Sequence, residues 1–175
     1  MLEILGIHSD VAGEVHLDDG HAWLSMHFTN GEQTTIGLWT STPLQLKNFV
    51  KDPTGLILDE SFDVNFGLEA ARGYRPKVSR YYKLSNAQAR RAVALMGSYT
   101  GWRITNTCAA WAAGIMRELQ VEDLDASELG GMIQTPRALS KTLTALESRN
   151  RTTLTNPKPI TSNPITKGSL SAMSA

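Results

Sequence analysis

The sequence predicts an α+β fold in which an antiparallel sheet packs against helices. Three observations predict it: apolar and polar residues alternate near the start, a strong hairpin turn follows, and apolar residues recur at helical spacing from Ser85 onward. The chain has 175 residues, of which 41% are hydrophobic. That is enough for one domain with its own core, and too little for two full domains.

The clearest strand is residues 21–28, "HAWLSMHF". Its alternation separates two faces, Ala22, Leu24, Met26 and Phe28 on one and His21, Trp23, Ser25 and His27 on the other. Asn30-Gly31 then predicts a hairpin turn, because both residues tolerate positive φ, and residues 32–40 form the partner strand. A two-residue loop would set Trp23 opposite Leu38 and His21 opposite Thr40. The histidine face is then partly apolar, and we expect it to be covered.

Between residues 43 and 73, prolines and glycines interrupt any long element. Within this part "FDVNFGLEA" (residues 62–70) could supply another strand, and residues 79–84, "SRYYKL", are a further short strand.

Three helices follow. Ser85 and Gln88 form a capping box for the first, a cap at residue 105, 106 or 107 starts the second, and Thr135 with Pro136 starts the third. The expected apolar faces are Ala89, Ala92, Val93, Met96 and Tyr99 in the first helix, Cys108, Trp111, Ala112, Ile115 and Leu119 in the second, and Leu139, Leu143 and Leu146 in the third.

After Glu147 the composition becomes rich in Thr, Ser, Asn and Pro, without aromatic residues. Such a segment buries too little surface to offset the entropy lost on ordering. We therefore expect a domain over residues 1–147 and a flexible tail over residues 148–175.

Charge and cysteine content exclude several classes of protein. Lys plus Arg and Asp plus Glu both number 17, so no broad attraction to nucleic acid or anionic lipid is implied. A single cysteine excludes an internal disulfide framework. The first residues have no basic region, and their apolar run is too short for a signal peptide or a membrane span. We expect synthesis and folding in a cytoplasm.

That single cysteine, Cys108, lies in the first turn of the second predicted helix. Unpaired N–H groups and the helix dipole favour an anion there, so the thiolate is favoured and the same amides could hold an oxyanion. The alternative is structural, since a lone cysteine often behaves as a small buried hydrophobe.

A histidine on a rigid element could act as the base for this thiol. His21 begins the best-defined strand and lies away from the evident core residues, whereas His27 lies at the turn end and His8 and His16 lie in less regular sequence. His21 could also be an ordinary histidine at a strand end. The four histidines lack the spacing of known metal-ligand patterns, so we expect no metal and no cofactor.

Three motifs together, "GHAWLS", "GLW" and "NTCAAWA", resemble the circularly permuted branch of the papain-like fold, in which the histidine precedes the cysteine. That branch includes NlpC-type cell-wall peptidases and lecithin:retinol acyltransferase-like thiol enzymes. Over residues 20–146 the chain is most similar to type VI secretion amidase effectors, which cleave peptide bonds in the peptidoglycan of competing bacteria.

The resemblance implies that Cys108 is the nucleophile and His21 the general base. Four residues stay open as the third, orienting residue: Thr40, Glu69, Glu14 and His16. It also implies a peptidoglycan peptide as substrate, a cognate immunity protein as partner, and delivery from a bacterial cytoplasm to the periplasm of a target cell. Neither nucleic-acid binding nor membrane insertion is expected.

Two other interpretations stay open at this point. The same dyad could serve a thiol acyltransferase or a deamidase, or the chain could be a non-catalytic interaction module with an inert Cys108. Trp23, Trp39, Trp102 and Trp111 are either walls of a substrate groove or part of the core.

Overall fold

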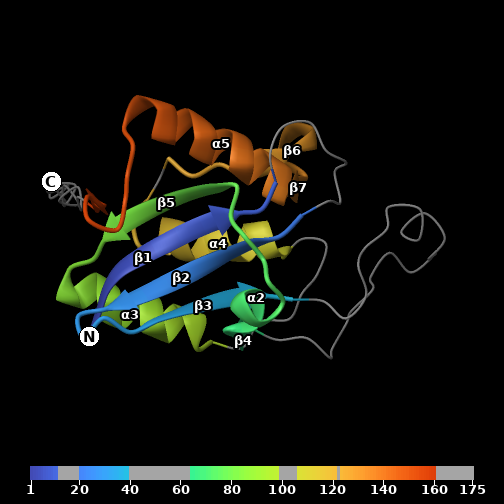
Figure 1. Cartoon of the computed structure of the whole chain (residues 1–175). Coiled ribbons are helices and arrows are strands. Elements are labelled where there is room, and N and C mark those ends of the chain that lie inside the picture. Colours follow the sequence, from blue (N-terminus) through green and yellow to red (C-terminus); the bar gives the residue numbers. More distant parts are fainter. Residues whose placement is uncertain (12–19, 40–63, 99–105, 122, 161–175) are drawn as a thin grey trace, which may run out of the picture.

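The computed structural model describes residues 1–11, 20–39, 64–98, 106–121 and 123–160. Its main feature is a six-stranded sheet in the order β4-β3-β2-β1-β5-β8, antiparallel except for the β5-β8 pair (Figure 1). The elements are β1 (Leu2–Ser9), β2 (Ala22–Phe28), β3 (Gln33–Leu38), β4 (Val64–Phe66), α2 (Leu68–Ala71), β5 (Val78–Lys83), α3 (Asn86–Met96), α4 (Cys108–Glu118), β6 (Ser127–Glu128), the 3₁₀ turn η1 (Leu129–Gly131), β7 (Ile133–Gln134), α5 (Pro136–Arg149) and β8 (Lys158–Pro159). The predicted α+β class is confirmed.

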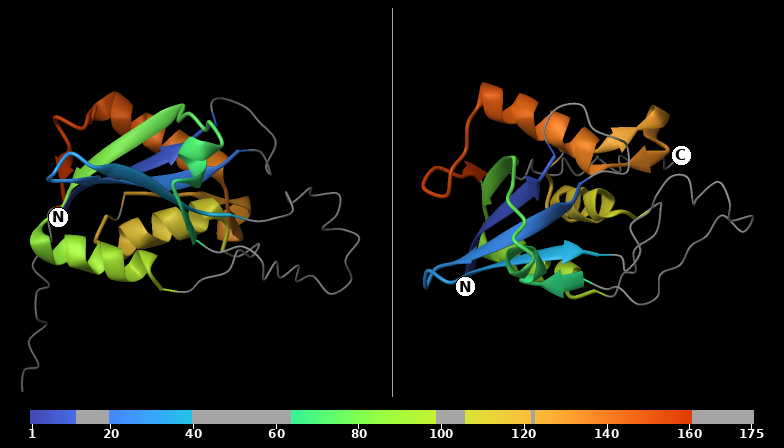
Figure 2. Two further views of the ribbon diagram at one scale, coloured as in Figure 1. Left: turned by 60° about the horizontal axis from the view of Figure 1, so that its bottom comes forward. Right: turned by 45° about the vertical axis from the view of Figure 1, so that its right-hand side comes forward.

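The helices α3, α4 and α5 share one face of the sheet with the hydrophobic core (Figures 1 and 2). Leu5, Leu24 and Ile36 reach this core from three neighbouring strands and are fully buried. The short helix α2 lies over the opposite face, because it contacts Gly37, whose neighbours Ile36 and Leu38 point into the core. Within the described ranges, no helix has the length and apolar character needed to cross a membrane.

All three predicted helix starts are confirmed. Ser85 and Gln88 form the capping box of α3, Thr107 Oγ1 accepts from Ala110 N at 3.1 Å at the start of α4, and Thr135 caps α5. The predicted buried faces hold for α4 and, in the main, for α5, but Val93 of α3 is 53% exposed. That prediction was wrong because α3 presents only a narrow stripe to the sheet, Ala89, Ala92 and Met96; Tyr99 lies outside the described residues.

The predicted hairpin between β2 and β3 exists, but its register differs by one residue. Leu24 pairs with Ile36 and Ser25 with Thr35, so Trp23 faces Gly37 instead of Leu38. The reason is a longer loop, in which Phe28 N donates to Glu32 O at 2.9 Å and Gly31 takes a φ of 84°. Residues 29–31 therefore form a three-residue turn with glycine in the left-handed position.

The strand β1, which the sequence pattern did not single out, is central in the sheet. It pairs with β2 on one side and β5 on the other. Of the other expected strands, residues 79–84 correspond to β5, and "FDVNFGLEA" contains β4 followed by the helix α2.

The folded domain extends past the expected boundary at residue 147. The helix α5 ends at Arg149, Thr152 is buried, and β8 adds a short parallel strand next to β5. Thr152 is held by polar contacts, since its hydroxyl accepts from Tyr81 N at 2.9 Å and donates to Glu147 Oε1 at 2.9 Å. Composition does not reveal such contacts, and residues 161–175 lie outside the described residues.

The face of the sheet away from the core helices carries a buried network around His8. Its Nδ1 lies 2.8 Å from Ser79 Oγ, and its Nε2 lies 2.7 Å from Ser25 Oγ, which in turn lies 2.9 Å from His27 Nε2. Gly6 makes this approach possible, because a Cβ there would collide with Ser25 Oγ and lie 2.7 Å from His8 Nε2. Burial, with the nearby charge of His27, lowers the pKa of His8 to about 3.

This network predicts an acid-sensitive contribution to stability. The unfolded chain protonates His8 below its ordinary pKa of 6.5, whereas the folded chain keeps it neutral down to about pH 3. The free energy of unfolding should therefore fall as the pH drops below 6.5, by up to about 1.4 kcal/mol per pH unit from this residue. Urea unfolding of wild type and H8Q at pH 6.5, 5.5 and 4.5 measures it. Burial also lowers the pKa of His27, so His27 contributes to the pH dependence of both proteins. Parallel curves for wild type and H8Q would contradict the prediction.

Candidate functional site

His21 is held rigidly just before β2. Its backbone N donates to Asp10 Oδ1 at 2.6 Å, and Asp10 N donates to His21 O at 3.2 Å. Gly20 has a φ of 89°, where a Cβ would collide with Val11. These contacts fix the direction in which the imidazole leaves the sheet, and the residue is 6% exposed.

The buried carboxylate of Glu69 lies beside this imidazole. Glu69 comes from α2 and is 1% exposed, and its Oε1 lies 3.2 Å from His21 Nε2. Trp39 Nε1 donates to the same oxygen at 2.9 Å. The sequence offered Glu69 as one of four orienting residues and placed it on a possible strand; the strand assignment was wrong, since Gly67 ends β4 and starts a helix. Thr40, Glu14 and His16 lie outside the described residues.

Gly37 lets this pair form. A Cβ at this position would collide with Glu69 Oε1 and would lie 3.0 Å from His21 Nε2. Since successive residues of β3 alternate between faces, Ile36 and Leu38 enter the core while position 37 faces the pair. The carboxylate and the imidazole therefore meet in the space that a side chain at position 37 would fill.

Aromatic rings enclose His21. The ring centroid of Trp39 lies 4.0 Å away, that of Tyr74 5.5 Å and that of Trp23 5.6 Å. Arg72 places its guanidinium carbon 4.6 Å from the centre of the Trp39 ring. Trp23 and Trp39 thus border the imidazole, whereas Trp111 belongs to the core and Trp102 lies outside the described residues.

Cys108 is the first residue of α4 and is 7% exposed. Thr107 caps the helix and also donates from its Oγ1 to Gln134 O at 2.7 Å, which ties the turn to β7. The amide of Ala110 is used by the cap, so within the described part of the chain the amides of Cys108 and Ala109 are the first-turn donors without a protein acceptor. The Cys108 side chain lies close enough to His21 to raise the pKa of its imidazole, so the structure brings these two expected residues together.

The partners of His21 reverse the effect of its burial. Burial by itself lowers its pKa, but hydrogen bonds with Cys108 and Glu69, and the negative charge of these groups, raise the pKa to about 9. Burial would raise the pKa of Glu69, but hydrogen bonds from His21, Trp39 and others lower it. At neutral pH the site therefore holds an imidazolium next to the Glu69 carboxylate, with the Cys108 sulfur nearby.

Thr35 completes the environment of the carboxylate. Its hydroxyl faces Glu69 and helps to lower the pKa, although Thr35 Oγ1 and Glu69 Oε2 reach no hydrogen bond of ordinary geometry in the described ranges. His8 and His27 lie on the same sheet face but belong to the serine network and not to this site. In the described residues, no three His, Cys, Asp or Glu side chains are grouped as metal ligands.

Sequence reasoning found the thiol and the imidazole, offered Glu69 among four orienting residues and named Trp39 as a candidate groove wall. It missed Gly37 and Tyr74. Gly37 and Trp39 both belong to the "GLW" motif, which is the one sequence signal that included them. No sequence pattern indicated Tyr74, because it comes close to His21 only in the folded structure. No model of a known protein family matches the chain, and neither curated proteins nor solved structures gave a match.

Replacing the Glu69 carboxylate by an amide should lower the pKa of His21. In E69Q the negative charge and the charge-assisted hydrogen bond are lost, while burial, which lowers the pKa, stays. An NMR titration of the imidazole signals measures the shift from about 9. E118Q, which removes a surface carboxylate paired with Arg91, is the control and should leave His21 unchanged; an unchanged His21 in E69Q would contradict this account of the site.

A methyl group at position 37 should separate Glu69 from His21. G37A forces the carboxylate or the backbone to move, at a cost of about 1–3 kcal/mol for overpacking. Thermal unfolding gives the stability, and the His21 titration should show a lower pKa than in wild type. G114A is the matched control, because nothing lies within 4 Å of a Cβ in the middle of α4; it should stabilise the chain by about 0.5–1 kcal/mol.

Proposed function

We propose that this chain is a cysteine hydrolase that cleaves an amide bond in peptidoglycan peptides, on a papain-like fold, and acts as an antibacterial effector delivered to other cells. One observation carries the proposal. A cysteine at a helix start lies beside an imidazole whose Nε2 is 3.2 Å from a buried carboxylate oxygen. Nucleophile, base and orienting group are the three parts that thiol acyl transfer requires.

The order and arrangement of elements support the fold assignment. The histidine begins a strand of an antiparallel sheet, and the later cysteine begins a helix packed on that sheet. This is the order of the permuted papain-like branch that the motifs "GHAWLS" and "NTCAAWA" resemble. The substrate class and the delivery route come from that resemblance.

In the first half of the reaction, Cys108 gives its proton to His21, which forms the imidazolium, and the sulfur attacks the amide carbon to give a tetrahedral intermediate that collapses to a thioester. His21 Nε2 is directed at Glu69, so Nδ1 is the ring nitrogen left for the sulfur and for the leaving group. The tetrahedral oxyanion would be held by the amides of Cys108 and Ala109 at the positive end of α4. Collapse breaks the C–N bond, and the imidazolium gives its proton to the departing amine.

In the second half, water attacks the thioester carbon and His21 takes a proton from this water. The C–S bond breaks, the product leaves as a carboxylic acid, and the sulfur and the imidazole return to their starting state. Glu69 does not react; it keeps the ring oriented and stabilises the imidazolium, aided by Trp39.

Digestion of purified peptidoglycan tests the proposal. Wild type should release new fragments, identified by mass spectrometry, and both C108A and H21A should release none at the same concentration. H27A is the matched control, because His27 shares the strand and face of His21 but bonds to Ser25; it should keep activity within a few fold. The masses of the fragments identify the bond.

Absence of fragments from every common type of peptidoglycan would contradict the substrate assignment. The thiol chemistry is then tested separately, by the rate of Cys108 alkylation with iodoacetamide at pH 7. A reactive pair predicts fast alkylation that slows in H21A and E69Q. Equal, slow rates in all three proteins would contradict a catalytic role.

A further inference from the structure

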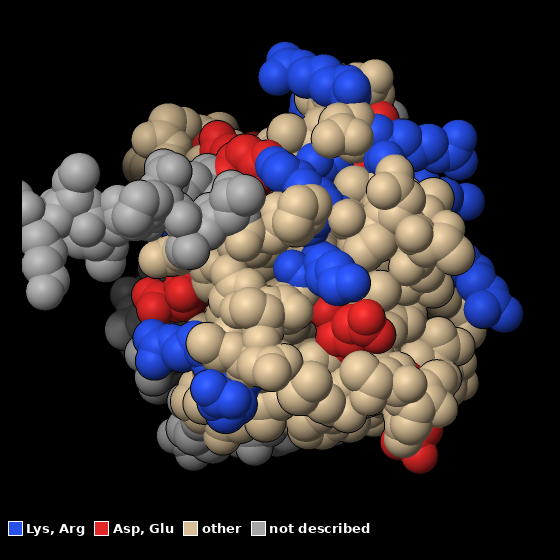
Figure 3. Space-filling model, turned by 90° about the vertical axis from the view of Figure 1, so that its left-hand side faces the viewer, with Lys and Arg blue, Asp and Glu red and all other residues tan. Residues whose placement is uncertain are grey.

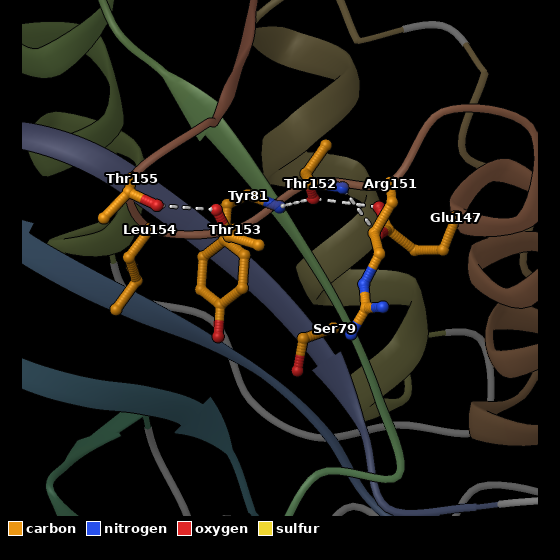
Figure 4. A pocket seen from close by; sticks show the side chains of 8 residues that line it. All are labelled: Ser79, Tyr81, Glu147, Arg151, Thr152, Thr153, Leu154 and Thr155. Carbon is orange, nitrogen blue, oxygen red and sulfur yellow. Dashed lines mark hydrogen bonds between the residues drawn. The ribbon is translucent and has the colours of Figure 1, made fainter.

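A second polar region lies on the sheet face that carries His21, at the other side of β1. It is a hollow of about 480 Å³ between β5 and the loop that joins α5 to β8. Its lining residues are Ser79, Tyr81, Glu147, Arg151, Thr152, Thr153, Leu154 and Thr155 (Figure 4). The function proposed above makes no use of it.

The charge that this hollow offers to a ligand is positive. Glu147 is already engaged, since its Oε1 accepts from Arg80 Nη1 at 2.6 Å and its Oε2 accepts from Thr152 N at 2.7 Å. Arg151 forms no ion pair in the described part of the chain. On the side of the molecule where this loop lies, Lys and Arg side chains gather along the upper and right-hand parts of the surface (Figure 3).

The other groups in the hollow are hydroxyls on a fixed frame. Thr152 anchors the loop to Tyr81 N and to Glu147, and the hydroxyls of Thr153 and Thr155 lie 3.0 Å apart. In Figure 4 the Tyr81 hydroxyl, the Ser79 hydroxyl and the Arg151 guanidinium point to the same side of the loop. A guanidinium beside several hydroxyls suits a carboxylate, which accepts paired hydrogen bonds from arginine.

We propose that this hollow binds a free carboxylate of the peptide substrate, with Arg151 as its cationic partner. The hydroxyl of Thr153 or Thr155 that does not donate within their mutual hydrogen bond is a further donor. This rests on the proposed function, because it assigns part of the substrate of the same site. The carboxylate is a specificity group and takes no part in the chemistry at Cys108.

The sheet register sets the distance between the two places. Ser79 pairs with His8 on β1, and His8 pairs with Trp23 on β2, two residues beyond His21. Two strand spacings of about 4.8 Å separate β5 from β2, and the two-residue offset adds about 6.6 Å along the strand, so the hollow begins roughly 12 Å from His21. An extended peptide advances about 3.3 Å per residue. The recognised carboxylate therefore lies about three or four residues from the bond that is cut.

Binding to the inactive C108A protein tests this without any turnover. The probes are two synthetic tetrapeptides of stem-peptide sequence that differ only in a C-terminal carboxylate or carboxamide, measured by isothermal titration calorimetry. We expect the carboxylate peptide to bind about tenfold more tightly. C108A/R151Q should lose that preference, and C108A/R149Q, which moves the same charge change two residues away, should keep it.

The outcomes separate the two proposals. If wild type cleaves peptidoglycan but R151Q leaves the carboxylate preference unchanged, the hollow assignment is overturned and the hydrolase stands. If no substrate is cut but carboxylate binding depends on Arg151, the hollow stands and the hydrolase fails. In an active enzyme, R151Q should raise KM for the carboxylate peptide and leave kcat unchanged. T153V, which removes one hydroxyl from the exposed loop, gives a second and smaller loss of preference.

Discussion

The meeting of His21 and Glu69 in the space left by Gly37 is the contact on which the site depends. It joins three separate parts of the chain, the residue just before β2, the end of β3 and the short helix α2. A buried ion pair is costly unless its members have further partners. Trp39 supplies one to the carboxylate, and Cys108 supplies one to the imidazole. The ion pair is thus stabilised as part of the site.

The register of the β2–β3 hairpin determines whether this contact exists. The three-residue turn sets Trp23 opposite Gly37, which brings the gap in β3 to the imidazole. A shift of one residue would turn every side chain of β3 to the other face and place Ile36 or Leu38 against His21. The predicted two-residue loop gave a register that was wrong by this one residue, because Asn-Gly favours a two-residue turn. The local sequence does not show that Gly31 instead ends a three-residue turn.

What the sequence could predict was largely local. Helix caps are bonds between a side chain and an amide two or three residues away, so Ser85, Thr107 and Thr135 were readable and Cys108 followed as a first-turn residue. Contacts between segments that are distant in the chain could not be predicted from the sequence. Glu69 could be offered as an orienting residue only beside three others, and the packing of Thr152 under β5 depends on hydrogen bonds that composition does not encode.

Two histidines on one sheet face show why only one of them suits acid–base chemistry. His8 and His21 are both buried, and burial lowers the pKa of each. His8 has serine hydroxyls as partners, which add no charge, and burial together with the nearby charge of His27 lowers its pKa to about 3. His21 has the Cys108 sulfur and the Glu69 carboxylate as partners, and their negative charges help to raise its pKa to about 9. A proton donor and acceptor at neutral pH must hold a proton that it can still release. The anionic partners of His21, and not its strand or its depth, meet that requirement.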